Sequence, residues 1–220
     1  MSWESSALYY QLINEAVRDR LGGLHSAKIV SSSVDFAEIE QLQSIGDWAM
    51  AGQILAEQAR RLEAAGADFL LLCTNTMHKV APEIEDAVSI PLLHLADTTA
   101  IAVAERGIST IGLLGTAFTM EQDFYKDRVA AHGLTVIVPD AAQRAVIHRV
   151  IYEELVLGVA NDASREQYVE IIASLHERGA EGVILGCTEI ELLVGETDSP
   201  IPVFPTTRLH AEAAVRTALA

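Results

Sequence analysis

Cys73 and Cys187 are the two residues of this sequence best suited to chemistry, because each ends a short apolar run and each is followed by threonine. Both lie in copies of one internal repeat, since Leu62–Thr74 resembles Leu175–Thr188 with one inserted residue. A lone cysteine is usually a small buried hydrophobe, and a disulfide is the other alternative. Duplication at equivalent strand ends favours a chemical role, in which one thiolate accepts a proton and the other thiol donates one.

Polar residues that can bind an anion follow both cysteines. We expect them to cap helices that begin there, where backbone N–H groups attract a carboxylate. Glu189 either orients Cys187 or stabilises the helix start, and Thr116 either binds substrate or is a turn residue. His78 is expected on a helix surface, and Asp35 with Glu38 in a solvated loop. The candidate substrate-binding residues are Thr74, Asn75, Thr76, Thr116, Thr188 and Glu189.

The elements around these residues are typical of an α/β protein, because short runs rich in Val, Ile and Leu alternate with helical periodicity. The expected strands are Lys28–Val34, Phe69–Cys73, Leu92–Leu95, Thr110–Leu114, Thr135–Val138, Val183–Cys187 and Pro202–Phe204. The expected helices are Glu4–Arg20, Asp47–Ala64, Pro82–Ala87, Thr98–Glu105, Met120–Ala131, Ala141–Leu157, Arg165–Glu177 and Arg208–Leu219.

The repeat predicts two similar α/β lobes with mainly parallel sheets, related by a pseudo-twofold axis, with the active site in the cleft between them. Residues 1–98 with 207–220 form the first expected lobe, and residues 99–206 form the second. Facing thiols at a carboxylate site suit inversion of the carbon next to a carboxyl group: one thiolate removes the Cα proton and the opposite thiol protonates the other face.

Composition narrows the choice of partners. Of the 220 residues, 31 are acidic and 15 are Lys or Arg, a net charge of −16, so nucleic acid and anionic membranes are poor partners. The seven histidines show no metal-binding spacing and no phosphate-binding glycine motif occurs, so neither a metal nor a nucleotide cofactor is expected. The start of the chain does not read as a secretory signal, so the prediction is a cytoplasmic protein with reduced thiols.

The repeat also predicts a missing strand. Ile111–Thr116 precedes Met120-Glu121 in the second half, whereas nothing precedes the corresponding Trp3-Glu4 in the first half except Met1 and Ser2. The hypothesis is that the first lobe lacks its first strand, because the chain starts roughly nine residues late. Such a chain is expected to be less stable and less active than an extended one.

The motifs Cys73–His78 (CTNTMH) and Gly186–Ile190 (GCTEI) resemble the paired cysteine motifs of the aspartate/glutamate racemase superfamily, in its aspartate-racemase branch. The resemblance covers essentially the whole chain and is strongest to broad-specificity amino-acid racemases. It implies two pseudo-symmetric lobes, no pyridoxal phosphate, Cys73 and Cys187 as the acid/base pair, and a homodimer. It also implies that the last helix packs on the first lobe.

The substrate is less well defined by the sequence. In aspartate-specific relatives the resemblance implies a lysine near residues 141–157 that holds the side-chain carboxylate, and this chain has none there. The prediction is therefore a cofactor-independent racemase or epimerase of broad or non-aspartate specificity. The alternatives are a strict aspartate racemase, another isomerase or a decarboxylase of the superfamily, and a non-enzymatic carboxylate-binding protein that carries thiols.

Overall fold

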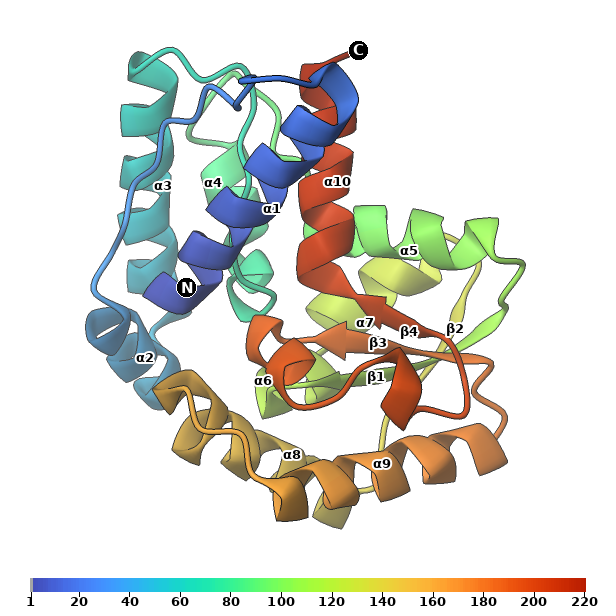
Figure 1. The fold of residues 1–220 in the computed structure, drawn as a ribbon. Coiled ribbons are helices and arrows are strands. Elements are labelled where there is room, and N and C mark those ends of the chain that lie inside the picture. The colour runs from blue at the N-terminus through green and yellow to red at the C-terminus, as the bar shows by residue number, and fades with distance from the viewer. Residues whose placement is uncertain (1) are drawn as a thin grey trace. The chain divides into compact units, whose positions relative to one another are not determined.

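Two units make up the computed structural model, which describes residues 2–220 (Figure 1). One unit consists of the residues up to His94 together with Ala211–Ala220, and the other is Leu95–His210. The last helix, α10 (Thr206–Ala218), therefore begins in the second unit and ends in the first. Each unit is described by itself below.

The second unit contains a parallel sheet in the order β2-β1-β3-β4. The central strands β1 and β3 carry apolar or glycine residues at almost every position and are buried along nearly their whole length, as expected of strands covered on both faces. The strand bounds are β1 Thr110–Gly115, β2 Thr135–Ile137, β3 Gly182–Gly186 and β4 Val203–Pro205.

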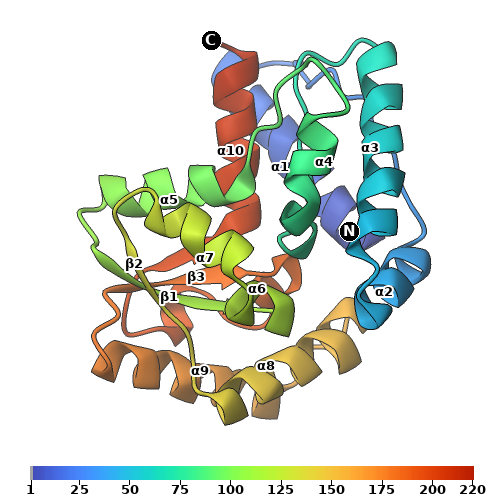
Figure 2. The ribbon, with the colours of Figure 1, turned by 180° about the vertical axis from the view of Figure 1, so that it is seen from behind.

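Helices cover both faces of this sheet (Figures 1 and 2). One core joins Leu114 and Val183 of the sheet to Ile147 of α8 and Tyr168 of α9. The opposite core joins the sheet to α5 and α7. The helices of this unit are α5 Leu95–Glu105, α6 Ala117–Glu121, α7 Asp123–Ala130, α8 Ala141–Glu153, η2 Leu155–Leu157, α9 Asp162–Glu177, η3 Thr188–Leu192 and η4 Glu196–Asp198.

The first unit is mostly helical. Its core gathers Ile39, Leu55, Leu70 and Met77, and α1 packs through Tyr9 and Leu12 against Ala211 of α10. The expectation that the last helix packs on the first lobe therefore agrees with this contact. The helices of this unit are α1 Trp3–Leu21, α2 Phe36–Ile45, α3 Trp48–Ala64, η1 Thr76–Val80 and α4 Ala81–Glu85.

The strands expected in the first unit are wrong as regular elements. Lys28–Val34 forms no regular element and pairs with no strand among residues 2–220. The runs at residues 69–73 and 92–95 reduce to one parallel bridge between Leu70 and Leu92. The physical reason is pairing: a strand forms only where a neighbour accepts its hydrogen bonds. Asp35, expected in a loop, instead caps the unforeseen helix α2 by accepting the Ala37 N–H.

The remaining expected strands and most expected helices are present within a few residues of their predicted bounds. The fold is α/β with a parallel sheet, and all four strands expected after residue 98 are present. The expected helix at 120–131 is split, because Gln122 has extended backbone angles between α6 and α7.

Within residues 2–220, no helix is both long enough and apolar enough to cross a membrane.

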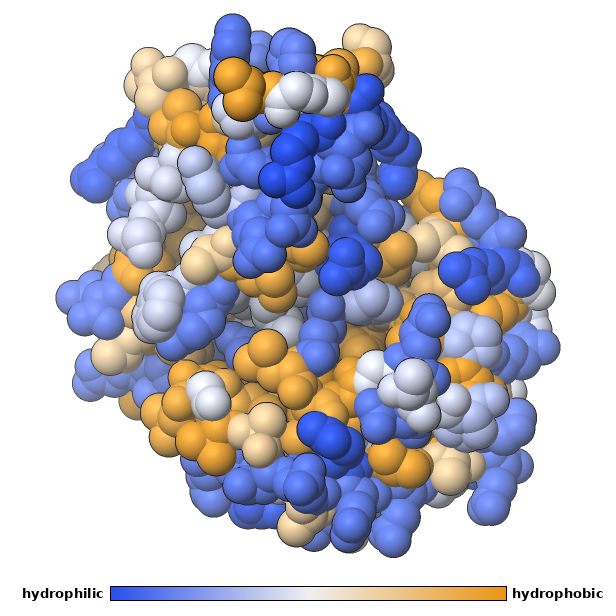
Figure 3. Space-filling model, in the orientation of Figure 1, coloured by the Kyte–Doolittle hydropathy of each residue, from blue (hydrophilic) through white to orange (hydrophobic). Residues whose placement is uncertain are grey.

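Apolar residues gather on one face of the second unit. Figure 3 shows them over the region of α8 and η3, where η2 lies against η3. Leu157 of η2 and Leu192 of η3 are among the exposed large apolar side chains.

Candidate active site

The second cysteine follows the carboxyl end of β3, beside the end of β1. Gly115 and Gly186 are register partners in these two strands. A Cβ atom at Gly186 would lie 2.7 Å from the Leu114 carbonyl oxygen, so only glycine allows this approach. Because Thr116 and Cys187 directly follow the two glycines, both lie at the carboxyl end of the parallel strands. Ligands bind at this end in open α/β folds.

The Cys187 thiol donates a hydrogen bond to Glu189, with Sγ and Oε2 3.0 Å apart. Both groups are largely withdrawn from water, and Glu189 is 7% exposed. The pKa of the Cys187 thiol is raised well above its ordinary value. Burial has the largest effect, and the Glu189 carboxylate adds to it. The resting group is therefore a thiol whose proton already points at a carboxylate.

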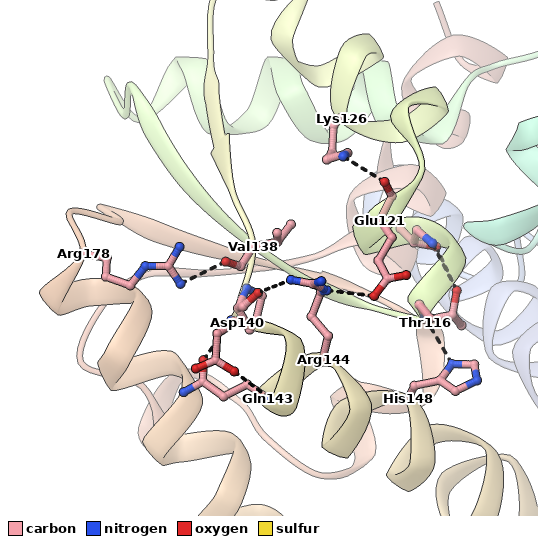
Figure 4. Close-up of polar contacts among 12 residues, drawn as sticks. Thr116, Glu121, Lys126, Val138, Asp140, Gln143, Arg144, His148 and Arg178 are labelled. Atoms are coloured by element: carbon pink, nitrogen blue, oxygen red, sulfur yellow. Dashed lines mark hydrogen bonds and ion pairs between the residues drawn. The ribbon is translucent and has the colours of Figure 1, made fainter.

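Thr116 caps α6 by accepting the Thr119 N–H at 3.3 Å. The next amide, Ala117 N–H, donates to Nδ1 of His148 at 3.2 Å (Figure 4). Burial lowers the pKa of His148, which keeps Nδ1 available as an acceptor. His148 thus fixes the turn that carries Thr116, a role that the sequence reasoning missed because nothing in the spacing of the histidines indicates it.

An ion pair supports this arrangement one turn earlier on α8. Arg144 Nε lies 2.9 Å from Oε1 of Glu121, and Arg144 Nη1 donates to the Pro139 carbonyl at 2.8 Å (Figure 4). Asp140 caps α8 and forms a capping box with Gln143. These contacts tie the end of α6 to the start of α8, and so hold His148 in place.

A second carboxylate, Glu191, lies two residues beyond Glu189 in η3. Burial raises its pKa to about 7, and the Arg208 guanidinium opposes that shift. Among the described residues, neither Oε1 of Glu191 nor Oγ1 of Thr207 has a hydrogen-bond partner, and both atoms are buried. The sequence reasoning missed Glu191, although its place four residues after Cys187 was visible.

The first cysteine lies in the first unit, after the Leu70 bridge and before η1. Ser5 of α1 donates its hydroxyl to the Cys73 carbonyl oxygen at 3.1 Å, which ties the start of α1 to this turn. Burial raises the pKa of the Cys73 thiol to about 11. Cys73 and Cys187 are both thiols rather than a disulfide.

The residues that follow Cys73 are more deeply buried than expected. Asn75 and Thr76 are buried, and His78 is 3% exposed, so its expected place on a helix surface is wrong. Nδ1 of His78 donates to the Thr74 carbonyl at 2.7 Å, and its ring lies 4.4 Å from the ring of His94. The expected capping is also wrong, because the helices after the two cysteines are short 3-10 turns without a side-chain cap.

The predicted site residues therefore form two groups. Thr116, Cys187, Thr188 and Glu189 gather at the sheet edge of the second unit. Residues 73–76 form a continuous turn in the first unit. Each group offers one thiol together with buried hydroxyl or amide groups, a composition suited to a carboxylate and to proton transfer.

Comparison with known proteins identifies the family. Residues 1–214 match the sequence profile of Asp/Glu/hydantoin racemases. The chain is 27% identical over 169 residues to the broad specificity amino-acid racemase RacX of Bacillus subtilis. The aligned region covers 76% of this chain and 71% of that protein.

Solved structures give the same result. A putative Asp/Glu racemase from Yersinia pestis is 53% identical with a TM-score of 0.94, over 100% of this chain and 96% of that one. An aspartate racemase homologue from Pyrococcus horikoshii is 31% identical with a TM-score of 0.86, over 99% and 95% of the two chains. The chain therefore belongs to the Asp/Glu/hydantoin racemase family and is an isomerase.

Proposed function

We propose that this protein is a cofactor-independent amino-acid racemase of broad or non-aspartate specificity, with Cys73 and Cys187 as its acid/base pair. The observation that carries the proposal is the thiol of Cys187, held 3.0 Å from a buried carboxylate at a sheet edge. Its internal-repeat counterpart, Cys73, stands in the equivalent turn of the first unit.

The proposed reaction moves one proton off the substrate and one proton onto it. A thiolate takes the Cα proton, the electron pair of the broken C–H bond stays on the substrate, and the opposite thiol protonates the other face of the same carbon. The thiolate has then moved from one cysteine to the other, so the charge is conserved. The proposal requires both thiols to reach opposite faces of one Cα.

In this scheme Glu189 is the group that deprotonates the Cys187 thiol. A thiol must lose its proton before it can act as a base, and the Sγ–H of Cys187 already points at Oε2 of Glu189. Glu189 therefore accepts this proton when Cys187 works as the base, and returns it when Cys187 works as the acid. The Cα–H bond is much less acidic than a thiol of pKa ~8.5, so exclusion of water and binding of the substrate carboxylate must supply the rest.

The substrate carboxylate is assigned to the hydroxyl and amide groups beside the thiols. Thr74, Asn75 and Thr76 serve in the first unit, and Thr116 with Thr188 serves in the second. The absence of lysine from residues 141–157, together with the likeness to RacX, supports broad rather than aspartate-restricted specificity. A homodimer and a cytoplasmic location stay predictions, to be tested by sedimentation and by cell fractionation.

The function is tested by incubating the purified protein with a panel of L- and D-amino acids in D2O. Loss of the Cα proton signal by NMR and appearance of the other enantiomer by chiral chromatography are expected for several amino acids, with or without added pyridoxal phosphate. The Cys73→Ala/Cys187→Ala double variant is the control. Turnover confined to aspartate would contradict the specificity, and release of carbon dioxide or no exchange with any amino acid would contradict the racemase.

A further inference from the structure

Hydrogen bonds fix the backbone around Cys73 in the first unit. The Thr74 N–H donates to the Leu72 carbonyl at 2.8 Å, which closes a γ-turn with Cys73 at its centre. The Ser5 hydroxyl donates to the Cys73 carbonyl at 3.1 Å. Nδ1 of His78 donates to the Thr74 carbonyl at 2.7 Å. Three consecutive carbonyl groups are therefore held in place beside the thiol.

The bond from His78 fixes the direction of the peptide group between Thr74 and Asn75. A carbonyl oxygen can only accept a hydrogen bond, so Nδ1 of His78 carries the proton. The C=O and N–H groups of a planar trans peptide point in opposite directions, so a bond that holds the Thr74 carbonyl also directs the Asn75 N–H. His78 thus orients the backbone between the thiol and Asn75, one of the candidate substrate-binding residues.

The imidazole of His78 is itself held in place. The residue is 3% exposed, and its ring centroid lies 4.4 Å from that of His94, which is buried as well. Side chains in a close-packed interior have few alternative rotamers. Nδ1 therefore stays directed at the Thr74 carbonyl.

The second unit fixes its cysteine in another way. In the second copy of the repeat, aligned through its cysteine and its Ile-Pro pair, Leu192 and Pro205 take the places of the two histidines. Neither residue has a side chain that can donate a hydrogen bond. Cys187 has an extended backbone, with φ −150° and ψ 132°, and donates its thiol to Glu189. The first unit therefore holds its cysteine through the backbone, and the second holds its cysteine through the thiol.

We propose that His78 is a positioning residue for the reaction at Cys73, and that it acts through the hydrogen bond from Nδ1 to the Thr74 carbonyl. This role rests on the proposed function, in which Cys73 transfers a proton at Cα of the substrate. Without the bond, the peptide group after Thr74 can rotate, and the thiol and the Asn75 amide lose their fixed relation. A misplacement of about 1 Å is enough to slow a reaction roughly a hundredfold.

Two substitutions separate the hydrogen bond from the ring. His78→Asn keeps an N–H donor and removes the imidazole. An asparagine can reach the carbonyl oxygen four residues earlier in a helix, as Asn14 does in α1, where its Nδ2 donates to the Tyr10 carbonyl at 2.8 Å. His78→Phe keeps an aromatic ring beside His94 and removes the donor.

Lys79→Gln is the matched control. It changes the next residue of η1, whose Nζ lies 4.0 Å from the centroid of the Trp48 ring. The substitution therefore removes a contact of the same short helix and leaves the Thr74 carbonyl bond in place.

The first readout is deuterium exchange at Cα with saturating substrate, in two backgrounds. In Cys187→Ala, where Cys73 is the remaining base, His78→Phe should slow exchange about tenfold to a hundredfold. His78→Asn and Lys79→Gln should stay close to the rate of that background. In Cys73→Ala, where Cys187 is the base, all three variants should exchange as that background does. A general loss of stability would instead lower both rates.

The second readout does not depend on catalysis. It is the rate at which iodoacetamide alkylates Cys73 in the Cys187→Ala background. His78→Phe should raise this rate about fivefold to tenfold, because a turn that has lost one hydrogen bond opens more often and exposes the thiol. His78→Asn and Lys79→Gln should leave the rate unchanged.

Three results would overturn the proposal. One is an unchanged alkylation rate in His78→Phe. Another is a loss in His78→Asn as large as that in His78→Phe, which would assign the effect to the ring rather than to the donor. The third is slower exchange in both cysteine backgrounds. Absence of exchange in every protein and with every amino acid would refute the racemase instead, and the alkylation rates would still decide whether His78 positions Cys73.

Discussion

The two cysteine segments, Cys73–Met77 and Cys187–Glu191, share a position in the repeat but differ in charge. Two residues after the cysteine, Asn75 stands in the first segment and Glu189 in the second. Four residues after it, Met77 stands in the first and Glu191 in the second. The second segment thus carries two carboxylates at places where the first carries an amide and a thioether. The two copies of the repeat therefore differ in the number of side chains that can accept a proton beside the cysteine.

This difference matters for the two thiols. Burial raises the pKa of both thiols, but Cys187 donates to a carboxylate that can take its proton, whereas the corresponding place in the first segment holds the amide of Asn75. If each thiol serves as the base for one enantiomer, the two directions of racemisation should respond differently to changes at Glu189. The predictions below test that inequality, from the largest expected effect to the smallest.

Replacement of either thiol should have the largest effect. Cys73→Ala and Cys187→Ala should each lower the rate of interconversion by roughly a hundredfold to ten thousandfold, the usual contribution of a positioned general acid or base. Chiral chromatography of product measures the effect. A variant that keeps more than about a tenth of the original rate would remove its cysteine from the acid/base pair.

The polar anchors should come next. Asn75→Ala and Thr188→Val should each lower kcat/KM by roughly tenfold to a hundredfold, because each loses one charge-assisted hydrogen bond to the substrate carboxylate. Thr135→Val, at an exposed position of β2, is the matched control and should leave turnover unchanged. Unchanged kcat/KM in both test variants would show that these residues only support the local fold.

Glu189→Gln makes the second segment resemble the first. Because the carboxylate contributes to the raised pKa of Cys187, its removal should make this thiol titrate at lower pH, while kcat falls about tenfold for want of a proton acceptor. Ultraviolet thiolate absorbance in the Cys73→Ala background follows Cys187 alone. Glu196→Gln, an exposed change in η4, is the control. An unshifted titration with unchanged kcat would refute this role.

Glu191 should make stability depend on pH. Burial raises its folded-state pKa from 4.5 to about 7, against the opposing charge of Arg208 and with the added repulsion of Glu189. The folded state therefore binds the proton more tightly than the unfolded state. The free energy of unfolding should fall as pH rises from about 4.5 to 7, by about 3 kcal/mol in total.

Glu191→Gln should flatten that dependence and make the protein more stable than the original at pH 8. Urea unfolding at pH 5 and pH 8 measures both effects. The same slope in the original protein and in the variant would mean that Glu191 does not carry the dependence.

The second unit could be predicted well from sequence, because β1 and β3 are apolar runs buried on both faces and need no information beyond their own residues. The first unit could not, since Leu70 and its neighbours read as a strand but become one only where a partner strand is present. The local sequence pattern shows that a segment favours the extended conformation, but the segment forms a strand only if a neighbouring strand pairs with it.

The site divides in a similar way. Cys73 and Cys187 could be found because the repeat marks them twice. His148 and Glu191 could not, because the role of His148 depends on its bond to the Ala117 amide, and the raised pKa of Glu191 depends on its burial in the folded chain. The burial of His78 was missed for the same reason, since its bond to the Thr74 carbonyl exists only once η1 has formed.

The most direct test of the account is deuterium incorporation by the two single-cysteine variants, each supplied separately with the L- and the D-enantiomer of a turned-over amino acid in D2O. Slow exchange of the Cα proton is expected in one enantiomer with Cys73→Ala and in the other with Cys187→Ala, while inversion in either variant stays at or below about a hundredth of the original rate. Equal exchange of both enantiomers by either variant, or inversion as fast as exchange, would contradict a mechanism in which each thiol serves one face of the substrate.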